Sequence, residues 1–151
     1  MFLLMAESAH PEHGDARAET SRSTPHVLVV DDEPTILAAA ASILKAAGLE
    51  VSVARDGVAA LELVRAMPEG LHLLLSDVCM PGMGGVELGI EVARVAPAAA
   101  VILMSGRSDA ALQHRVRANG FRFLPKPFAA SLLLAMVTST LQASSRRHDR
   151  R

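Results

Sequence analysis

The stretch HVLVVDDEP, residues 26–34, decides the fold of this chain. After His26 it is apolar and rich in Val, and a short run of this kind is typical of a strand buried on both faces of a sheet. The run ends in two carboxylates, Asp31 and Asp32. Pro34 then stands where proline favours the first turn of a helix. The stretch therefore predicts a buried strand that leads through an acidic turn into a helix.

The same unit recurs along the chain, so strands are expected to alternate with helices. Short apolar runs predict strands at 26–30, 49–54, 71–76, 99–104 and 121–124. Helical spacing of apolar residues predicts helices at 34–47, 57–66, 85–95, 108–119 and 127–141, with Ser108 as the N-cap of the fourth. Five such pairs predict an α/β fold, a doubly wound five-stranded parallel sheet with helices on both faces.

The composition limits the classes of function. Half of the 151 residues are hydrophobic but only 3% are aromatic, with no Trp or Tyr, so a platform that stacks nucleic-acid bases is disfavoured. A net charge of −1 gives no overall field toward nucleic acid or an anionic membrane. A single cysteine, Cys79, excludes an internal disulfide and a cysteine-rich zinc site. These features suggest a reducing compartment, and we expect the protein to be cytoplasmic.

The two ends of the chain differ in composition from the centre. Residues 1–25 are expected to be a disordered N-terminal tail, residues 26–141 the folded domain, and residues 142–151 a solvated basic C-terminal tail. A weak contact of the basic tail with acidic partners or nucleic acid is the alternative. The apolar start, residues 1–5, is too short for a signal peptide or a membrane span. Translation from Met5 is a hypothesis that N-terminal mass spectrometry would test.

Polar residues stand where four of the expected strands end. They are Asp31, Asp32 and Glu33 after the first strand, Asp77 after the third, Ser105 after the fourth and Lys126 after the fifth. In open parallel sheets, ligands bind beyond the carboxyl ends of the strands, near the point where strand order reverses. We therefore expect these side chains to converge on one pocket.

The residue types in this pocket favour phosphoryl chemistry. Clustered carboxylates repel one another, and Mg²⁺, which prefers oxygen ligands and water, removes that cost. A carboxylate beside the metal can attack phosphorus, while a lysine and a hydroxyl stabilise the transferred oxygens. Taken singly, the acidic pair could be a turn or a helix cap, and the lysine and serine ordinary surface or strand-end residues. Their shared position at the strand ends favours the pocket.

Four motifs carry a family resemblance. They are DDEP at 31–34, SDVCMPGM at 76–83, MSG at 104–106 and FLPKPF at 123–128. In this order they resemble the receiver domain of response regulators over residues 26–141. The resemblance implies a flavodoxin-like (βα)5 fold and a stand-alone, CheY-like phosphoacceptor switch of a two-component phosphorelay. It implies no enzyme beyond catalysis of the protein's own phosphorylation and dephosphorylation.

The resemblance also implies roles for the acidic residues and their partners. Asp77 would accept the phosphoryl group. Asp32 would ligate Mg²⁺ directly and Asp31 largely through water, with Asp77 and the backbone carbonyl of Cys79 as further ligands. The expected phosphoryl donors are a histidine kinase or a histidine phosphotransfer protein, with small acyl phosphates as substitutes. The downstream protein target is unknown, and neither a DNA-binding domain nor a membrane anchor is expected.

The switch residues follow from the same resemblance. Lys126 would pair with Asp77 at rest and with the phosphoryl group afterwards, and a cis Lys126–Pro127 bond would fix its approach. Ser105 would move to hydrogen-bond the phosphoryl oxygen, and Phe123 would turn inward behind it. The output face would comprise the fourth helix, the fifth strand and the fifth helix.

Some positions depart from the family pattern. Cys79 and Arg107 occupy the two positions that usually tune the lifetime of the phosphoryl group, and we expect that lifetime to be lengthened. Phe121 replaces a usually small residue, and Gly84 replaces a commonly acidic one. Phe123 lacks the hydroxyl of the tyrosine often found at its position.

Rival functions conflict with particular residues. A receiver that has lost phosphorylation would not need the intact acidic pair, Asp77 and Lys126. A phosphatase of the aspartyl-phosphate type needs Asp-x-Asp, whereas Asp77 is followed by Val78 and Cys79. A nucleotide binder would need a glycine-rich loop after the first strand. A transcription factor would need a further domain after the fifth helix. The sequence LPKPF resembles receivers attached to hybrid kinases, which mildly favours a relay role.

Overall fold

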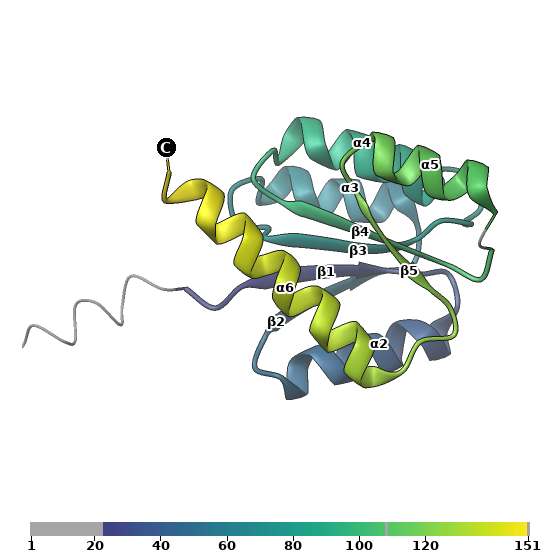
Figure 1. The fold of residues 1–151 in the computed structure, drawn as a ribbon, viewed down its shortest axis with the longest axis horizontal. Helices are drawn as coiled ribbons and strands as arrows, with labels where there is room; N and C mark the ends of the chain where they lie inside the picture. Colours follow the sequence, from purple (N-terminus) through teal and green to yellow (C-terminus); the bar gives the residue numbers. More distant parts are fainter. Residues whose placement is uncertain (1–22, 108, 151) are drawn as a thin grey trace, which may run out of the picture.

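The computed structural model describes residues 23–107 and 109–150, which form one five-stranded parallel sheet flanked by helices (Figure 1). The strand order is β2-β1-β3-β4-β5. The strands are β1 (His26–Val30), β2 (Glu50–Ala54), β3 (Leu73–Asp77), β4 (Ala100–Ser105) and β5 (Arg122–Pro125). The helices are α2 (Pro34–Ala46), α3 (Gly57–Ala66), α4 (Gly85–Val95), α5 (Ala110–Ala118) and α6 (Ala130–His148). The predicted fold class is therefore confirmed.

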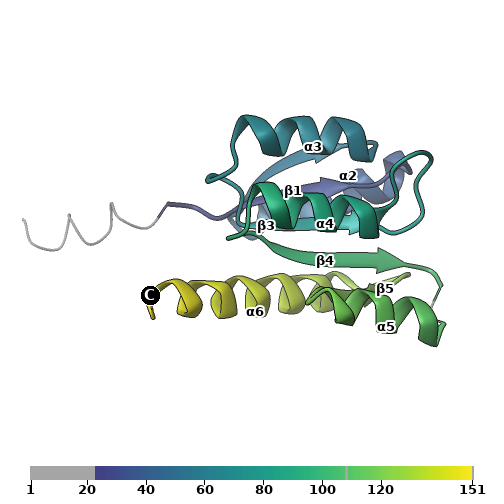
Figure 2. The same ribbon diagram turned by 90° about the horizontal axis from the view of Figure 1, so that it is seen from above.

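The apolar runs are buried because helices cover both faces of the sheet. Every residue of β1 and β3 is buried. Alternate side chains enter two separate cores, so Leu74 packs beneath α3, α4 and α5, whereas its neighbours Leu73 and Leu75 pack against α2 and α6. Figure 1 shows these two helical layers, and Figure 2 shows α5 and α6 at the β5 end of the sheet. Within the described residues, no helix is long and apolar enough to cross a bilayer.

The start of α5 differs from the prediction. Asp109 is its N-cap, and a carboxylate oxygen of Asp109 accepts a hydrogen bond from the backbone amide of Leu112 at 2.9 Å. The predicted cap, Ser108, lies outside the described residues, and its assignment as the cap was wrong. Serine and aspartate are similarly good N-caps, so two adjacent candidates leave this boundary undecided by composition alone.

The last helix also differs from the prediction. It ends at His148 rather than Leu141, so the predicted end of the fifth helix was wrong and residues 142–148 are helical. The Ser144 hydroxyl donates a hydrogen bond to the backbone oxygen of Ala98 at 3.3 Å, which ties the extension to the body of the protein. The basic residues of its last turn also favour a helix end. Of the predicted N-terminal tail, residues 1–22 lie outside the described part of the chain.

Helix α4 accommodates Phe121 and Gly84, the two residues that depart in size from the family pattern. A Cβ placed on Gly89 would lie 2.7 Å from Cε2 of Phe121, so this larger residue, just before β5, requires a glycine opposite it. A Cβ on Gly84 would lie 2.7 Å from Oε2 of Glu87, which folds back over the start of the helix. The other oxygen of Glu87 accepts a hydrogen bond from Arg115 of α5 at 3.0 Å. Hydrogen bonds from backbone amides at the helix start, followed by this arginine, lower the pKa of Glu87.

Candidate functional site

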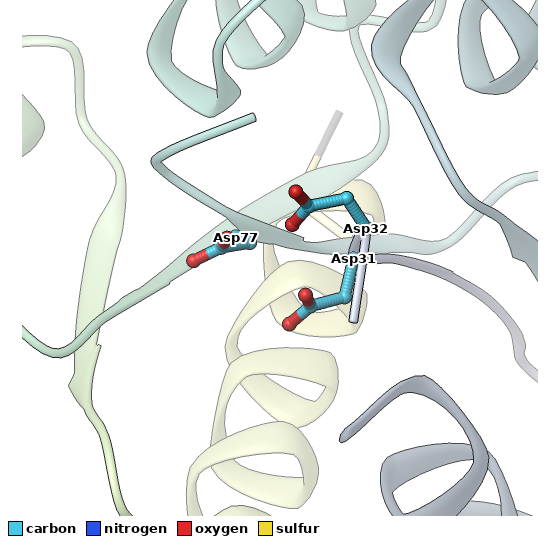
Figure 3. A group of neighbouring side chains, drawn as sticks. All are labelled: Asp31, Asp32 and Asp77. Atoms are coloured by element: carbon cyan, nitrogen blue, oxygen red, sulfur yellow. The ribbon is translucent and has the colours of Figure 1, made fainter. Parts of the chain in front are cut away.

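Three carboxylates meet at the carboxyl edge of the sheet (Figure 3). Asp31, Asp32 and Asp77 each offer one oxygen, and these three atoms all lie within 4.8 Å of one another. Asp31 is fully buried and Asp77 is 6% exposed. Side chains from two separate segments of the sequence thus form a compact acidic cluster.

The parallel register of the central strands explains this meeting. β1 lies beside β3 with Val30 opposite Ser76, so the next residue of each strand, Asp31 and Asp77, reaches the same edge side by side. One carboxylate oxygen of Asp31 accepts a hydrogen bond from the backbone amide of Glu33 at 3.0 Å. This bond shapes the turn that brings Asp32 to the cluster.

Lys126 is the cation of the site, and its side chain is only 12% exposed. Its Nζ donates to Oδ2 of Asp31 at 2.8 Å and to Oδ1 of Asp77 at 3.2 Å. The backbone amide of Lys126 also donates to the backbone oxygen of Ser105 at 2.8 Å, which anchors the segment after β5 to the end of β4. The Lys126–Pro127 peptide bond is cis, as the family resemblance implied. The bond to Asp31 was not anticipated.

The electrostatics of the cluster leave negative charge uncompensated. Burial raises the pKa of Asp77, and the charges of Asp31 and Asp32 raise it further, while Lys126 opposes them. Burial alone would lower the pKa of Lys126, but the hydrogen bond with Asp31 and the charges of both carboxylates outweigh it and raise that pKa. One lysine therefore faces three carboxylates. The three oxygens are hard donors of the kind that Mg²⁺ prefers, so the residues present fit a divalent cation.

The remaining predicted residues lie around this cluster. Ser105 is buried at the end of β4, where its hydroxyl accepts a hydrogen bond from the backbone amide of Arg107 at 2.9 Å. The side chain of Arg107 is exposed and pairs with Asp109 at 3.3 Å. Phe123 is half-buried and packs against the core beneath α3, α4 and α5. Cys79 is exposed. The structure thus brings Asp31, Asp32, Asp77 and Lys126 together and holds Ser105 in a local turn.

Sequence reasoning missed the role of Gly85. A Cβ on this residue would overlap the backbone oxygen of Asp77, and its amide donates to the backbone oxygen of Val78 at 2.9 Å. The loop from Asp77 can therefore fold closely onto the start of α4 only because residue 85 has no side chain. The pair of adjacent glycines before a helical pattern was the available signal.

The comparisons with known proteins agree with this geometry. The sequence model of the response regulator receiver domain matches residues 27–138. Sensor kinase CckA of Brucella abortus is 33% identical over 117 residues, which cover 77% of this chain and 12% of the kinase. A response regulator receiver protein of Anaeromyxobacter is 39% identical over 108 residues, covering 71% of this chain and 44% of that protein. The chain thus spans less than half the length of these two curated relatives.

Solved structures show the same fold. The CheY-like receiver domain protein of Methanospirillum hungatei superposes with a TM-score of 0.78 at 25% identity, covering 83% of this chain and 99% of that one. The receiver domain of hybrid histidine kinase CckA gives 0.67 at 34% identity, covering 77% and 98%. Receiver domains are phosphoacceptor switches of two-component signalling that interact with histidine kinases or phosphotransfer proteins. By its sequence, its sheet and its acidic pocket, this chain belongs to the response regulator receiver domain family.

Proposed function

We propose that this protein is a switch in which Asp77 accepts a phosphoryl group from a phosphohistidine on a histidine kinase or a histidine phosphotransfer protein. The observation that carries the proposal is the position of Asp77, buried beside two further carboxylates and 3.2 Å from Lys126. A carboxylate oxygen of Asp77 would attack phosphorus. The P–N bond would break, and its electron pair would remain on the imidazole nitrogen.

Mg²⁺ is the proposed cofactor. Asp32 and Asp77 would bind it directly, Asp31 through water, and the backbone carbonyl of Cys79 would complete the protein ligands. The bound cation would offset negative charge on the transferring oxygens. The support for this set is the acidic cluster, whose three carboxylates exceed the charge of Lys126.

The switch would follow because the phosphoryl group takes over hydrogen bonds that Lys126 and Ser105 make in the resting protein. Lys126 would transfer one hydrogen bond from Asp77 to a phosphoryl oxygen while keeping its bond to Asp31. Ser105 would exchange the backbone amide of Arg107 for the same phosphoryl group, and Phe123 would move inward into the space behind it. Phosphorylation would then shift a population between two forms because it binds one of them better.

The lifetime of the aspartyl phosphate is expected to depend on Arg107 and Cys79. Arg107 would leave its exposed pairing with Asp109 to shield the phosphoryl charge, and the thiol of Cys79 would orient water poorly. Both effects would slow hydrolysis. Arg107→Ala should therefore accelerate decay of the phosphorylated protein, and an unchanged decay rate would remove this part of the proposal.

The decisive experiment is the intact mass of the protein after incubation with acetyl phosphate and Mg²⁺. A phosphoryl adduct should form on the native protein and should be absent from Asp77→Asn and from a sample with EDTA. Asp56→Asn is a matched control, because Asp56 is an exposed helix cap outside the acidic cluster. Failure to form an adduct, even with a phosphohistidine donor, would indicate an interaction module that works without phosphorylation.

A further inference from the structure

α5 buries fewer residues than any other helix of the described chain. Of its nine residues only Val116 is buried, whereas α4 buries five of eleven. Leu112 adds a partly buried contact with the core. Packing of an apolar face supplies most of the free energy that fixes a helix in a protein. Polar contacts on its outer surface therefore carry more weight for α5 than for the other helices.

An ion pair joins the outer surface of α5 to α4. Nη2 of Arg115 lies 3.0 Å from Oε1 of Glu87, and both side chains are 55% exposed. Among the described residues, this is the one salt bridge that links α5 to another helix or strand. The other ion pair beside α5 joins Arg107 to Asp109, within the segment that leads into the helix. Loss of the Glu87–Arg115 pair would thus remove the ionic tie between α5 and its neighbours.

Glu87 is a fixed partner for Arg115 because its carboxylate is bonded to the start of its own helix. It stands three residues after the N-cap, Gly84, where a glutamate can fold back onto the cap. Hydrogen bonds from its own backbone amide, from Arg115 and from the amide of Gly84 lower the pKa of Glu87. The carboxylate is therefore ionised and held in place at neutral pH.

The start of α4 is in turn fixed to the strand end that carries Asp77. The amide of Gly85 donates to the backbone oxygen of Val78 at 2.9 Å. Gly85 also lies so close to Asp77 that a Cβ would overlap the backbone oxygen of that residue. The ion pair thus connects α5 to the backbone of the pocket through Glu87 and the first turn of α4.

The beginning of α5 lies a few residues beyond a side chain that the proposed switch would move. Ser105 ends β4, and its hydroxyl accepts a hydrogen bond from the amide of Arg107 at 2.9 Å. Asp109 caps α5 two residues further on. Movement of Ser105 toward a phosphoryl group would break the bond to Arg107 and free the segment that leads into α5. The ion pair at Arg115 would then oppose displacement of the helix.

We propose that Glu87 and Arg115 form a latch that holds α5 in its resting position and thereby limits how readily Asp77 is phosphorylated. The inference rests on the proposed function, because it requires the two forms between which phosphorylation would shift the population. A pair made only in the resting form stabilises that form. Its removal would raise the fraction of the second form before any donor is added, and a donor that reacts better with that form would react faster.

The strength of an exposed ion pair is sufficient for this role. Such pairs contribute about 0.2–1 kcal/mol, which matters little for global stability. A threefold change in the ratio of two forms corresponds to about 0.6 kcal/mol. The latch can therefore change the resting population without holding the fold together.

The test compares the rates at which acetyl phosphate and Mg²⁺ phosphorylate full-length variants, followed by intact mass. Glu87→Gln and Arg115→Gln should each raise the rate about threefold. The double variant should be no faster than either single variant, because each already opens the latch. Arg115→Lys keeps the charge and should stay near the native rate. Single variants with an unchanged or lower rate would overturn the inference.

Two control variants separate the latch from general charge effects. Glu91→Gln removes a glutamate of the same helix whose ion pair, with Arg94 at 3.1 Å, stays within α4. Arg117→Gln removes a second arginine from the last turn of α5, one without a salt bridge among the described residues. Both should leave the rate unchanged. Attraction of an anionic donor would instead make loss of Glu87 faster and loss of Arg115 slower, and that pattern would contradict the latch.

A second measurement needs no phosphorylation. The amide chemical shifts of α5 in a ¹⁵N NMR spectrum report the position of the helix. Beryllofluoride with Mg²⁺ imitates the phosphoryl group and defines the shifts of the second form on the native protein. Without it, Glu87→Gln and Arg115→Gln should move the α5 signals part of the way in the same direction. Changes confined to residues beside each substitution would show a local disturbance and contradict the latch.

The two proposals fail in different ways. An adduct on Asp77 that forms at one rate in every variant would leave the proposed function standing and remove the latch. Absence of the adduct from the native protein and from all variants, even with a phosphohistidine donor, would remove the proposed function and the latch with it.

Discussion

The acidic pocket of this protein and the groove over β5 between α5 and α6 are built in opposite ways. In the pocket, charges are buried and fixed, with Lys126 bonded to two carboxylates at 2.8 and 3.2 Å. In the groove, Arg117 and Arg122 are exposed and lack acidic partners among the described residues. The pocket is thus held in shape by its own ion pairs, whereas the arginines of the groove are not held by ion pairs of this kind.

The largest expected effect tests whether the pocket is rigid. Gly85→Ala would place a methyl group against the backbone oxygen of Asp77 and the Cα of Val78. Backbone atoms cannot escape by a change of rotamer, so we expect a loss of about 3 kcal/mol in the free energy of unfolding, measured in urea. Gly106→Ala is the control, because its Cβ would meet nothing within 4 Å and the change should stay within about 0.5 kcal/mol. Equal stability of the two variants would show that the pocket adapts.

A smaller effect tests whether the groove depends on a pair of residues. Gly89→Ala would bring a Cβ to 2.7 Å from the ring of Phe121 and 3.2 Å from Val101, both flexible side-chain contacts, and should cost about 1–2 kcal/mol. Phe121→Leu should relieve most of that cost, so a double-mutant cycle should show coupling of about 1 kcal/mol. Additive costs would mean that Gly89 and Phe121 do not pack against each other.

The smallest effect concerns the charge of the pocket. The pKa of Asp77 in the folded protein lies above its ordinary value of 3.8, chiefly because of burial. At neutral pH its ionised form therefore destabilises the fold, and stability is gained as pH falls through the folded pKa toward 3.8.

Asp77→Asn removes this dependence. Without Mg²⁺, the variant should have the higher Tm at pH 7, and the difference should shrink as pH falls toward 3.8. Lys126 opposes part of the effect of burial on the pKa of Asp77, so the Tm difference is expected to be modest. Thermal unfolding followed by circular dichroism would measure it, and a Tm difference independent of pH would contradict the assignment.

The sequence predicted the pocket better than the groove for a physical reason. Asp31, Asp77 and Lys126 stand at the carboxyl ends of strands, which share one edge of a parallel sheet, so motif order was enough to place them at that edge. The match between Gly89 and Phe121 depends on how α4 packs against the residue before β5, and local patterning carries no such information. The same holds for α6, whose last turns are fixed by a contact between Ser144 and Ala98 across 46 positions.

The ends of the described chain add a practical consequence. Figure 1 shows that β1 begins and α6 finishes on the same side of the sheet. The three carboxylates lie at the other ends of β1 and β3. A sensor surface that captures the protein beyond His148 would therefore present the pocket to the solution. The same attachment would crowd the cleft of about 520 Å³ that Arg147 and His148 help to line, while leaving access of a phosphodonor to Asp77 unchanged.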